Sequence, residues 1–323
     1  MTHIWRLEWY GVGKESARWT SVAPAIWIHH DEADFEDTIE KVIDESSLWK
    51  LMVSSASNKT KQYANWEIGG IMPSTSIGFF FLSLLWTVAS AETAGTWAYE
   101  HDFSMNNVNN KQSLTISKET PIQGLSFALA MVEALTVSAN VGEAVKMKAW
   151  LRAKAWAVAT LTKNYVEDNK FYAHMINIKL ADTVAGLDGA SALCIENIEL
   201  SLTQELEDGF CFESGVDLGD IYNKGFAIDG TFGNIRNSII FDNYVKDGIY
   251  KAMRIEMIDT SKTIWVSDNP TVQIDLARVS FEDHDEESGI NDVVRETTTF
   301  KGHYDLANDL DINIKVINEL SAY

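Results

Sequence analysis

Two stretches of the chain share one hydrophobic pattern, in which a strand-like run reaches a glycine, a helix-like segment follows, and several strand-like runs come after. The first stretch opens at residues 66–73 and continues into 76–86. The second opens at 226–232 and continues into 238–245. Two such units in one chain are typical of an internal repeat, and they indicate a building block for a symmetric assembly.

The segment 77–86 is apolar almost all round, so a helix there must be buried on several sides. Residues 68–91 carry no charge, but the interruption at 73–76 leaves an apolar run of 77–89, shorter than the ~20 residues that a spanning helix needs. We therefore predict a buried helix and no membrane insertion. Ser74, Thr75 or Ser76 is expected to supply its N-cap oxygen, and Gly95 is expected to mark its end.

Most of the remaining runs read as strands, and alternation of period two is clearest at 144–157. A basic face there predicts either a nucleic-acid stripe or pairing with an acidic face on 195–207, and the acidity of the chain favours pairing. The basic-face residues are Lys146, Lys148, Trp150, Arg152, Lys154 and Trp156, and the acidic ones are Glu199, Glu205 and Glu207. Other expected strands are 96–103, 112–117, 123–130, 134–139, 193–204, 225–232, 249–258, 271–281, 292–301 and 311–318, with a second helix at 237–246.

Two long segments, 31–65 and 205–224, precede the glycine strand of each unit. They are too long for strand connections and too mixed in polarity for a core, so we expect interaction loops that contact a neighbouring ring of an assembly. Removal of residues 46–61 is expected to leave a folded protein that does not polymerise.

The 323 residues include 26 basic and 47 acidic side chains, and the charge is uneven. Residues 1–162 hold 17 acidic and 13 basic residues, net −4, and residues 163–323 hold the remaining 30 and 13, net −17. Such a surface disfavours nucleic-acid binding. Two cysteines and no secretory start after Met1 indicate maturation in a reducing cytoplasm.

Catalytic and metal-binding patterns are weak. His29, His30, Asp31 and Glu32 are adjacent and point in alternate directions in an extended chain, so a solvated turn is favoured over a metal site. The acidic run 282–287 lacks the spaced ligands of a calcium loop and is expected to be an exposed loop. Residues 11–14 are too short for a phosphate loop. Cys194 and Cys211 are expected to be buried small hydrophobes. No catalytic, cofactor-binding or metal-binding residue is nominated, and we do not expect an enzyme.

Taken in order along nearly the whole chain, several motifs resemble the tail tube, or major tail, proteins of long-tailed bacteriophages. They are Gly11-Val12-Gly13-Lys14-Glu15, Pro24-Ala25-Ile26-Trp27-Ile28, the acidic stretch with Ile39, Glu40, Asp44, Glu45 and Ser46, Gly69-Gly70 before an apolar helix, His101-Asp102-Phe103, Ser113-Leu114-Thr115-Ile116, residues 227–230, Lys251-Ala252-Met253-Arg254-Ile255 and Ile314-Lys315-Val316-Ile317-Asn318. Where the family often has a proline after its early tryptophan strand, this chain has His29-His30.

The resemblance implies a β-sandwich or barrel with a flanking helix, and two tandem tail-tube-like domains at 1–162 and 163–323. Proteins of this family assemble into rings that stack into the hollow tube through which DNA passes into the host. It implies three copies per ring with pseudo-sixfold symmetry, or alternatively six. The implied partners are the tape measure protein, the tail terminator or head-tail connector, and tail tip proteins. Assembly in the host cytoplasm and residence in the virion tail follow.

Two other classes of protein share parts of this composition. A carbohydrate-binding or adhesin β-sandwich of a virion would be favoured if tryptophans were exposed in a groove. A glycosidase would need a pair of carboxylates, and no pair is nominated by the sequence.

Overall fold

A computed structural model of the chain describes residues 5–46, 49, 51–93, 97–108, 111–164, 166–264, 268–290 and 292–323. The strands are β1 (Trp9–Lys14), β2 (Ile26–Ile28), β3 (Glu32–Asp44), β4 (Ala56–Ile71), β5 (Trp86–Glu92), β6 (Tyr99–Met105), β7 (Leu114–Glu119), β8 (Gly124–Asn140), β9 (Lys146–Ala153), β10 (Ala157–Ala159), β11 (Ile176–Ala181), β12 (Asn197–Gly209), β13 (Asp220–Ile235), β14 (Lys251–Ile258), β15 (Thr271–Glu287), β16 (Arg295–His303) and β17 (Ile312–Asn318). The helices are α1 (Ile77–Leu85) and α2 (Ile240–Asp247), and short 3-10 helices lie at Trp5–Leu7, Ala173–Met175, Val184–Gly186 and Phe212–Ser214.

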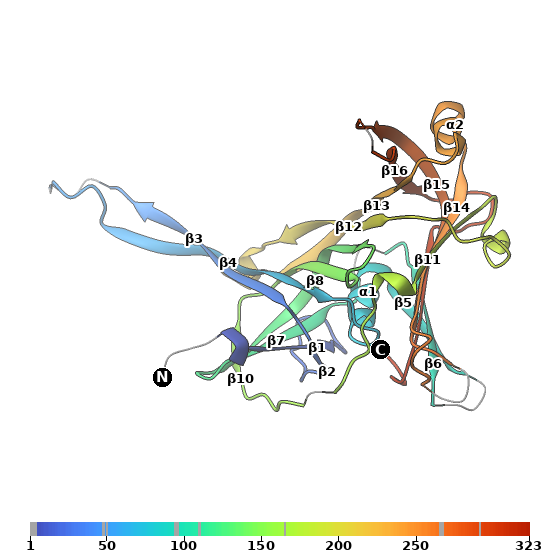
Figure 1. Cartoon of the computed structure of the whole chain (residues 1–323). Coiled ribbons are helices and arrows are strands. Elements are labelled where there is room, and N and C mark those ends of the chain that lie inside the picture. The colour runs from blue at the N-terminus through green and yellow to red at the C-terminus, as the bar shows by residue number, and fades with distance from the viewer. Residues whose placement is uncertain are drawn as a thin grey trace.

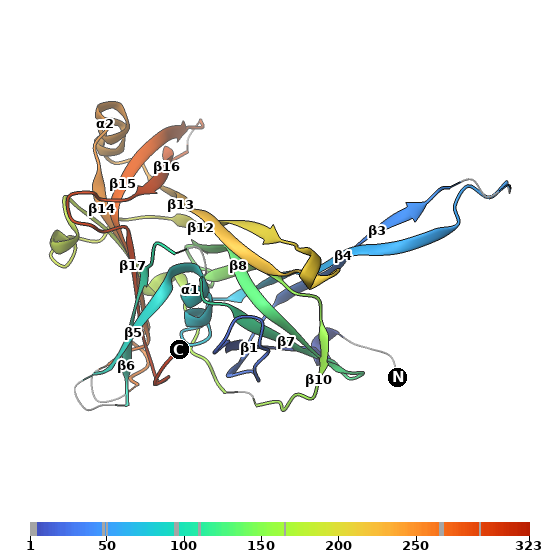
Figure 2. The same cartoon turned by 180° about the vertical axis from the view of Figure 1, so that it is seen from behind.

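The strands listed above are joined in one antiparallel network, which confirms the predicted mainly-β fold with flanking helices (Figure 1). One long hairpin, β3–β4, projects away from the body and is seen in both views (Figures 1 and 2). The strand predicted at 311–318 is confirmed as β17, whose residues alternate strictly between buried and half-exposed. No helix in the described part of the chain has the length and apolar character to cross a membrane.

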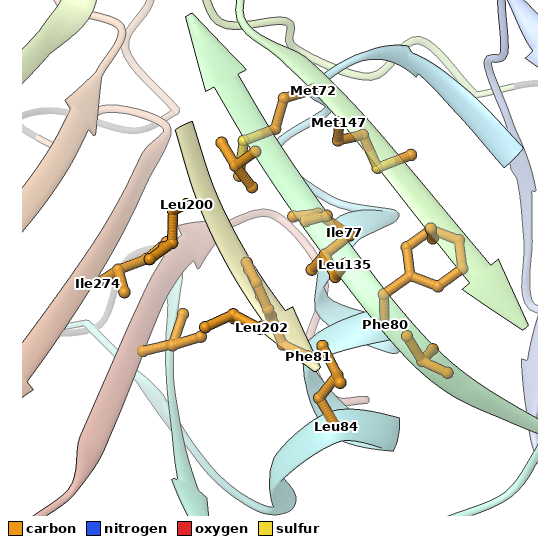
Figure 3. Packing of buried hydrophobic residues seen from close by; sticks show 14 of the residues in the cluster. Met72, Ile77, Phe80, Phe81, Leu84, Leu135, Met147, Leu200, Leu202 and Ile274 are labelled. Carbon is orange, nitrogen blue, oxygen red and sulfur yellow. The ribbon is translucent and has the colours of Figure 1, made fainter. Parts of the chain in front are cut away.

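Helix α1 is buried, as predicted. All nine of its residues are buried, because its apolar side chains point in every direction around the helix axis. Ile77, Phe80, Phe81 and Leu84 of α1 belong to one buried cluster with Leu135 of β8 and Leu202 of β12 (Figure 3). Residues from both halves of the chain therefore share one hydrophobic core.

The N-terminus of α1 is held differently from the prediction. Ser76 makes no side-chain capping bond. Instead, the buried carboxylate of Asp168 accepts hydrogen bonds from the backbone amides of Thr75 and Ser76, both at 2.9 Å, and from the hydroxyls of Ser74 and Ser76 at 3.2 and 3.0 Å. A negative charge at this end also interacts favourably with the helix dipole. The expected serine or threonine cap is therefore replaced by a carboxylate that lies far away in the sequence.

Several predicted boundaries change in the structure. The helix passes directly into β5 at Trp86, whose φ is 83°, and the predicted stop at Gly95 lies outside the described residues. The runs 123–130 and 134–139 form one strand, β8. The long run predicted at 144–157 ends at Ala153 and resumes as the short strand β10. The acidic run 282–287 is not a loop but the end of β15, because β16 pairs along it.

The order of strand neighbours is repeated in the two halves of the chain. In the first half the order is β1–β7–β8–β9–β4–β3, with β10 beside the start of β8. In the second half it is β11–β14–β15–β16–β13–β12, with β17 beside the start of β15. Helix α1 follows β4 and helix α2 follows β13. Strands β2, β5 and β6 are additions to the first half.

Irregularities in strand pairing also recur at matching places. Paired residues run from Glu32 to Glu40 in β3 and from Asn197 to Glu205 in β12, nine in each, before a bulge. Further bulges match between β7–β8 and β14–β15, at Leu114/Ile116 and Lys251/Met253, and between β8–β9 and β15–β16, at Val132/Ala134 and Phe281/Asp283. Because bulges are defined features of a strand pair, their coincidence is a further similarity between the two halves.

Two pairings between the strands listed above join the halves. Strand β12 pairs with β8, and β17 pairs with β6. The connection between the halves also bonds to the first half: the amide of Ser74 donates to the carbonyl of Asn169 at 2.8 Å, and the amide of Phe171 donates to the carbonyl of Met72 at 3.1 Å. The two halves therefore form one continuous body.

Candidate assembly surfaces

The first candidate surface is the β3–β4 hairpin, which replaces the loop predicted at 31–65. At its base Phe35 packs against Trp66 and Phe127, with ring centroids 4.7 and 4.9 Å apart. Beyond the bulge after Glu40 the hairpin leaves the body (Figure 1). Its outer part exposes six large apolar side chains, namely Val42, Ile43, Trp49, Leu51, Met52 and Val53, and the exposed fraction of Trp49 is 99%. Such a cluster on a projecting arm is typical of a protein–protein contact.

The hairpin of β12 and β13 is the counterpart of β3–β4 and accounts for the loop predicted at 205–224. Its tip folds back onto the first half instead of projecting. The amide of Gln62 in β4 donates to the carbonyl of Val216 at 2.8 Å. Arg18 forms an ion pair with Asp220 and donates to the carbonyl of Ile221 at 2.9 Å. Leu218 and Ile221 are fully buried in a small cluster with Leu129 and Met131. The two hairpins therefore differ: the apolar residues at the tip of β12–β13 are buried within the chain, whereas those at the tip of β3–β4 are exposed.

The second candidate surface is the outer edge of β15. Among the described residues, Asp283–Glu287 pairs with β16 on one side and with no strand on the other. The outer edge of β3 is likewise unpaired in the described part of the chain, because β4 is its sole neighbour there. Unpaired edges present backbone donors and acceptors to a further strand.

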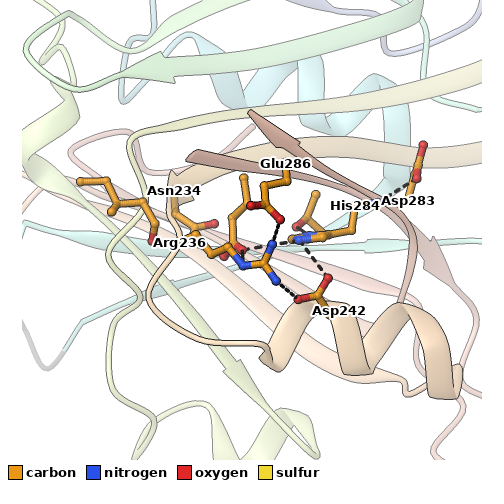
Figure 4. Close-up of polar contacts among 9 residues, drawn as sticks. Asn234, Arg236, Asp242, Asp283, His284 and Glu286 are labelled. Carbon is orange, nitrogen blue, oxygen red and sulfur yellow. Dashed lines mark hydrogen bonds and ion pairs between the residues drawn. The ribbon is translucent and has the colours of Figure 1, made fainter. Parts of the chain in front are cut away.

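A polar cluster beneath α2 holds one face of this β15 edge in place (Figure 4). Arg236 pairs with Asp242 of α2 at 2.8 Å and with Glu286 of β15. The His284 ring lies with Nε2 3.2 Å from an Asp242 oxygen and 3.5 Å from Glu296, and its Nδ1 lies 3.1 Å from the Thr298 hydroxyl. Because His284 and Glu286 turn toward this cluster, Asp283, Asp285 and Glu287 face the opposite side of the sheet.

Both unpaired edges are acidic. Strand β3 exposes Asp34 and Glu36 on the face opposite Phe35. The β15 edge exposes Asp283, Asp285 and Glu287. Charged side chains on a strand edge oppose indiscriminate pairing with other strands. The acidic residues therefore protect these two unpaired edges from non-specific association.

The basic face predicted on 144–157 is confirmed for β9, but its predicted partner strand is wrong. Strand β9 pairs with β4 and β8 and not with β12, although Arg152 forms an ion pair with Asp208 at the end of β12. Lys148 pairs with Glu67 at 2.6 Å, and this hydrogen bond raises the pKa of Lys148. Arg152 pairs with Glu133 at 3.3 Å and with Asp208 at 3.2 Å. A groove of about 410 Å³ beside this face is lined by Lys146, Lys148, Trp150, Asp31, Glu32 and Glu199 among others.

The other residues considered in the sequence are dispersed. Gly11 and Gly13 lie in β1, where a side chain on Gly13 would meet the carbonyl of Ala23 at 2.6 Å. His29 and His30 follow β2, and no group of three metal-ligating side chains occurs in the described ranges.

The prediction that both cysteines are buried is wrong, because Cys194 and Cys211 are exposed in connections between strands. Hydrogen bonds with Ser214 lower the pKa of the Cys211 thiol. The small cysteine side chains remain exposed because the backbone that carries them runs along the surface.

The exposure predicted for the acidic run 282–287 is confirmed for most of its residues, but the sequence did not reveal that this run continues β15. Every residue from 282 to 287 is polar, so the sequence shows no alternation of apolar and polar residues that would indicate a strand there. The sequence matches no protein-family model and no curated protein.

Proposed function

We propose that this chain is the subunit of the tail tube of a long-tailed bacteriophage, assembling into rings that stack into a conduit for DNA. The observation that carries the proposal is the projecting β3–β4 hairpin, whose apolar outer part is exposed although its counterpart β12–β13 is packed. Exposed apolar surface of this kind is costly in a protein that remains alone in water. A self-assembling structural protein would cover it.

The repeated strand order supports three copies per ring with pseudo-sixfold symmetry. If residues 1–162 and 163–323 are two tail-tube-like domains, each chain fills two positions of a ring, and three chains fill six. Unequal charges of −4 and −17 for the two halves are compatible with two positions that have diverged. The alternative is a ring of six chains with one elaborated domain each.

The net charge of −21 supports the role of conduit. A wall of acidic proteins offers a polyanion few binding sites, so DNA would pass without being retained. In this proposal the tape measure protein fills the tube before ejection, and a terminator or connector protein and the tip proteins close its two ends. The protein resides in the virion tail after assembly in the host cytoplasm, and it has no catalytic role.

Electron microscopy of the purified protein tests the proposal. Rings or hollow tubes are expected, and averaged cross-sections should show three chains arranged as six similar units. Six full chains around the lumen would contradict the duplication while leaving the tube function intact. A protein that stays monomeric at every concentration and salt condition would contradict the function itself.

A carbohydrate-binding adhesin is the competing class, and the positions of the exposed tryptophans favour the tube. Trp19, Trp49, Trp97 and Trp156 are each at least 44% exposed. They lie after β1, at the tip of the β3–β4 hairpin, before β6 and before β10, and Figures 1 and 2 show this hairpin tip far from β6 and β10. A sugar-binding groove would need such side chains together. Specific binding on a glycan array would reverse this preference.

A further inference from the structure

Within the chain, the two halves are joined by the pairing of β12 with β8, which we call the joint. This joint is a template for the binding of a second copy of the chain. Inside the chain, β12 of the second half pairs with the latter part of β8 of the first half, from Asn197 opposite Asn140 to Thr203 opposite Ala134. Leu200 and Leu202 of β12 are buried at this joint. It combines a ladder of backbone hydrogen bonds with apolar packing on one face.

The counterparts of the two strands in this joint are the two unpaired edges. Strand β3 corresponds to β12, and the latter part of β15 corresponds to that of β8, as the shared neighbour order and the matching bulges establish. One chain therefore carries one unused strand of each kind. A molecule with two different edges that can pair with each other associates head to tail, and such association closes into a ring when the rotation permits.

We propose that β3 of one copy pairs antiparallel with Asp283–Glu287 of β15 in a second copy, in the register that β12 takes on β8. Thr38 is the counterpart of Thr203, because each is the seventh paired residue of its strand, counted from Glu32 in β3 and from Asn197 in β12. Asp283 is the counterpart of Ala134, because each is the first paired residue after the bulge, in β15 and β8 respectively. The register therefore places Thr38 opposite Asp283, Glu36 opposite Asp285 and Asp34 opposite Glu287. This inference rests on the proposed function in that it requires self-assembly, and it names the partner and the surface.

The match between the two halves also predicts a binding site for the exposed outer part of the β3–β4 hairpin. Within the chain, the tip of β12–β13 bonds to Gln62, which lies opposite Ile39. The residue at the matching position of the second half is Phe226, which lies opposite Gln204. Phe226 lines a groove of about 360 Å³ with Met105, Ile228 and Tyr304. The apolar hairpin tip of one copy would settle over this groove of the next copy, so the hairpin joins neighbours around a ring and not one ring to another.

Cysteine cross-linking tests the register directly. In a protein with Cys194→Ser and Cys211→Ser, the pair Glu36→Cys and Asp285→Cys places two thiols directly opposite each other across the joint. Cα atoms of opposed residues lie ~4.5–5.5 Å apart in antiparallel strands, within the span of a disulfide. Mild oxidation should then produce covalent multiples of the chain on a non-reducing gel.

The matched control is Glu36→Cys with Glu286→Cys in the same background. A shift of one residue moves the second thiol to the other face of the sheet. Paired strands raise the effective concentration of the opposed thiols, so cross-linking of the first pair should be roughly tenfold faster or more. Equal rates for the two pairs would overturn the register, and absence of cross-linking at both low and high salt would overturn the joint. Circular dichroism verifies that each variant is folded.

Imaging of the cysteine-free protein separates this inference from the proposed function. Tubes without cross-linking of the first pair would mean that the copies are joined elsewhere, and the inference alone would fail. Cross-linked multiples without rings or tubes would support the joint and contradict the tube. Neither tubes nor cross-links would contradict both.

Discussion

Lys111 is a buried cation close to the end of α1. The residue is 3% exposed, and its Nζ donates to the carbonyl of Leu84 at 3.0 Å. Burial lowers the pKa of Lys111 to about 8, and the negative charge of Asp311 offsets this in part. The cation also lies at the end of the helix where positive charge is favourable, but removing it from water is the larger effect.

The free energy of unfolding should therefore depend on pH through Lys111. Its pKa is about 8 in the folded protein and 10.5 in the unfolded chain, so the unfolded chain binds more protons between these values and stability rises with pH. From about pH 7.5 to about pH 9.5 the wild type should gain about 2 kcal/mol relative to Lys111→Met. Urea unfolding of both proteins measures this difference. Burial raises the pKa of Tyr10 and Tyr323 in both, so their contribution cancels. A difference that does not change with pH would contradict the prediction.

Gly78 lies in α1 directly beneath the ring of Tyr323. A β-carbon added to Gly78 would lie 2.2 Å from Cζ of that ring, which is itself held by hydrogen bonds of its hydroxyl to Thr75 and Asn318, both at 2.6 Å. The ring cannot move aside without losing these bonds. The glycine is therefore required by packing and not by an unusual backbone conformation.

Gly78→Ala should destabilise the protein by about 1–3 kcal/mol, although alanine is the better helix former by about 1 kcal/mol. Thermal or urea unfolding measures the loss. In a Tyr323→Ala background the obstructing ring is gone, and the same substitution should become neutral or stabilising. A double-mutant cycle reports the coupling between the two positions. Equal losses in both backgrounds would mean that the ring is not the cause.

At the scale of elements, the two equivalent hairpins play different structural roles within one chain. The described hydrogen bonds of Lys41–Thr60 remain within the β3–β4 hairpin. The outer part of β12–β13 instead buries Leu218 and Ile221 and bonds to Arg18 and Gln62. The same architecture is therefore a free arm in one half and part of the body in the other.

Replacement of residues 41–60 by Asn-Gly should leave the melting temperature within about 2 °C of the wild type and abolish self-assembly, because little packing is lost. This replacement is preferable to removal of residues 46–61, since β4 begins at Ala56. The matched control replaces residues 206–224 by Asn-Gly. It should lower the melting temperature by about 5 °C or more, because buried side chains are lost. Normal rings from the first variant would exclude the hairpin as an assembly arm.

At the scale of the whole molecule, the proposed joint brings like charges together. Glu36 would face Asp285, and Asp34 would face Glu287, so repulsion opposes pairing until salt screens it. The Debye length falls from about 30 Å at 0.01 M to about 10 Å at 0.1 M ionic strength. The acidic edges thus make assembly dependent on conditions and prevent other strands from pairing.

Assembly should increase with salt, and Asp285→Lys should remove much of this requirement, because the new lysine would attract Glu36. Sedimentation velocity at low and moderate salt measures both effects. Glu143→Lys changes the net charge equally and is exposed far from the β15 edge in the strand order, so it serves as the control. Equal behaviour of the two variants would show that net charge matters and that the β15 edge does not.

Local sequence patterns determined much of the fold. Alternation revealed β9 and β17, since a strand with one buried face must alternate apolar and polar residues. The run at 77–86, apolar except for Ser83, was enough to predict a buried helix. The repeated strand-glycine-helix pattern pointed to two similar halves, and the matching strand neighbours have the same arrangement. Each of these features depends on which neighbouring residues are buried, and the order of apolar and polar residues in a short stretch of sequence indicates this.

Only the tertiary structure decided which distant segments meet. Asp168 caps α1 across a separation of more than 90 residues, so no local pattern at Ser74–Ser76 could reveal it. The outer parts of β3 and β15 have no apolar face in the core, and their strands are held by backbone pairing that leaves no alternation to read. Only the structure shows that β12 pairs with β8 while β3 and the end of β15 lack such a partner among the described residues, because strand pairing is set by the geometry of the whole sheet.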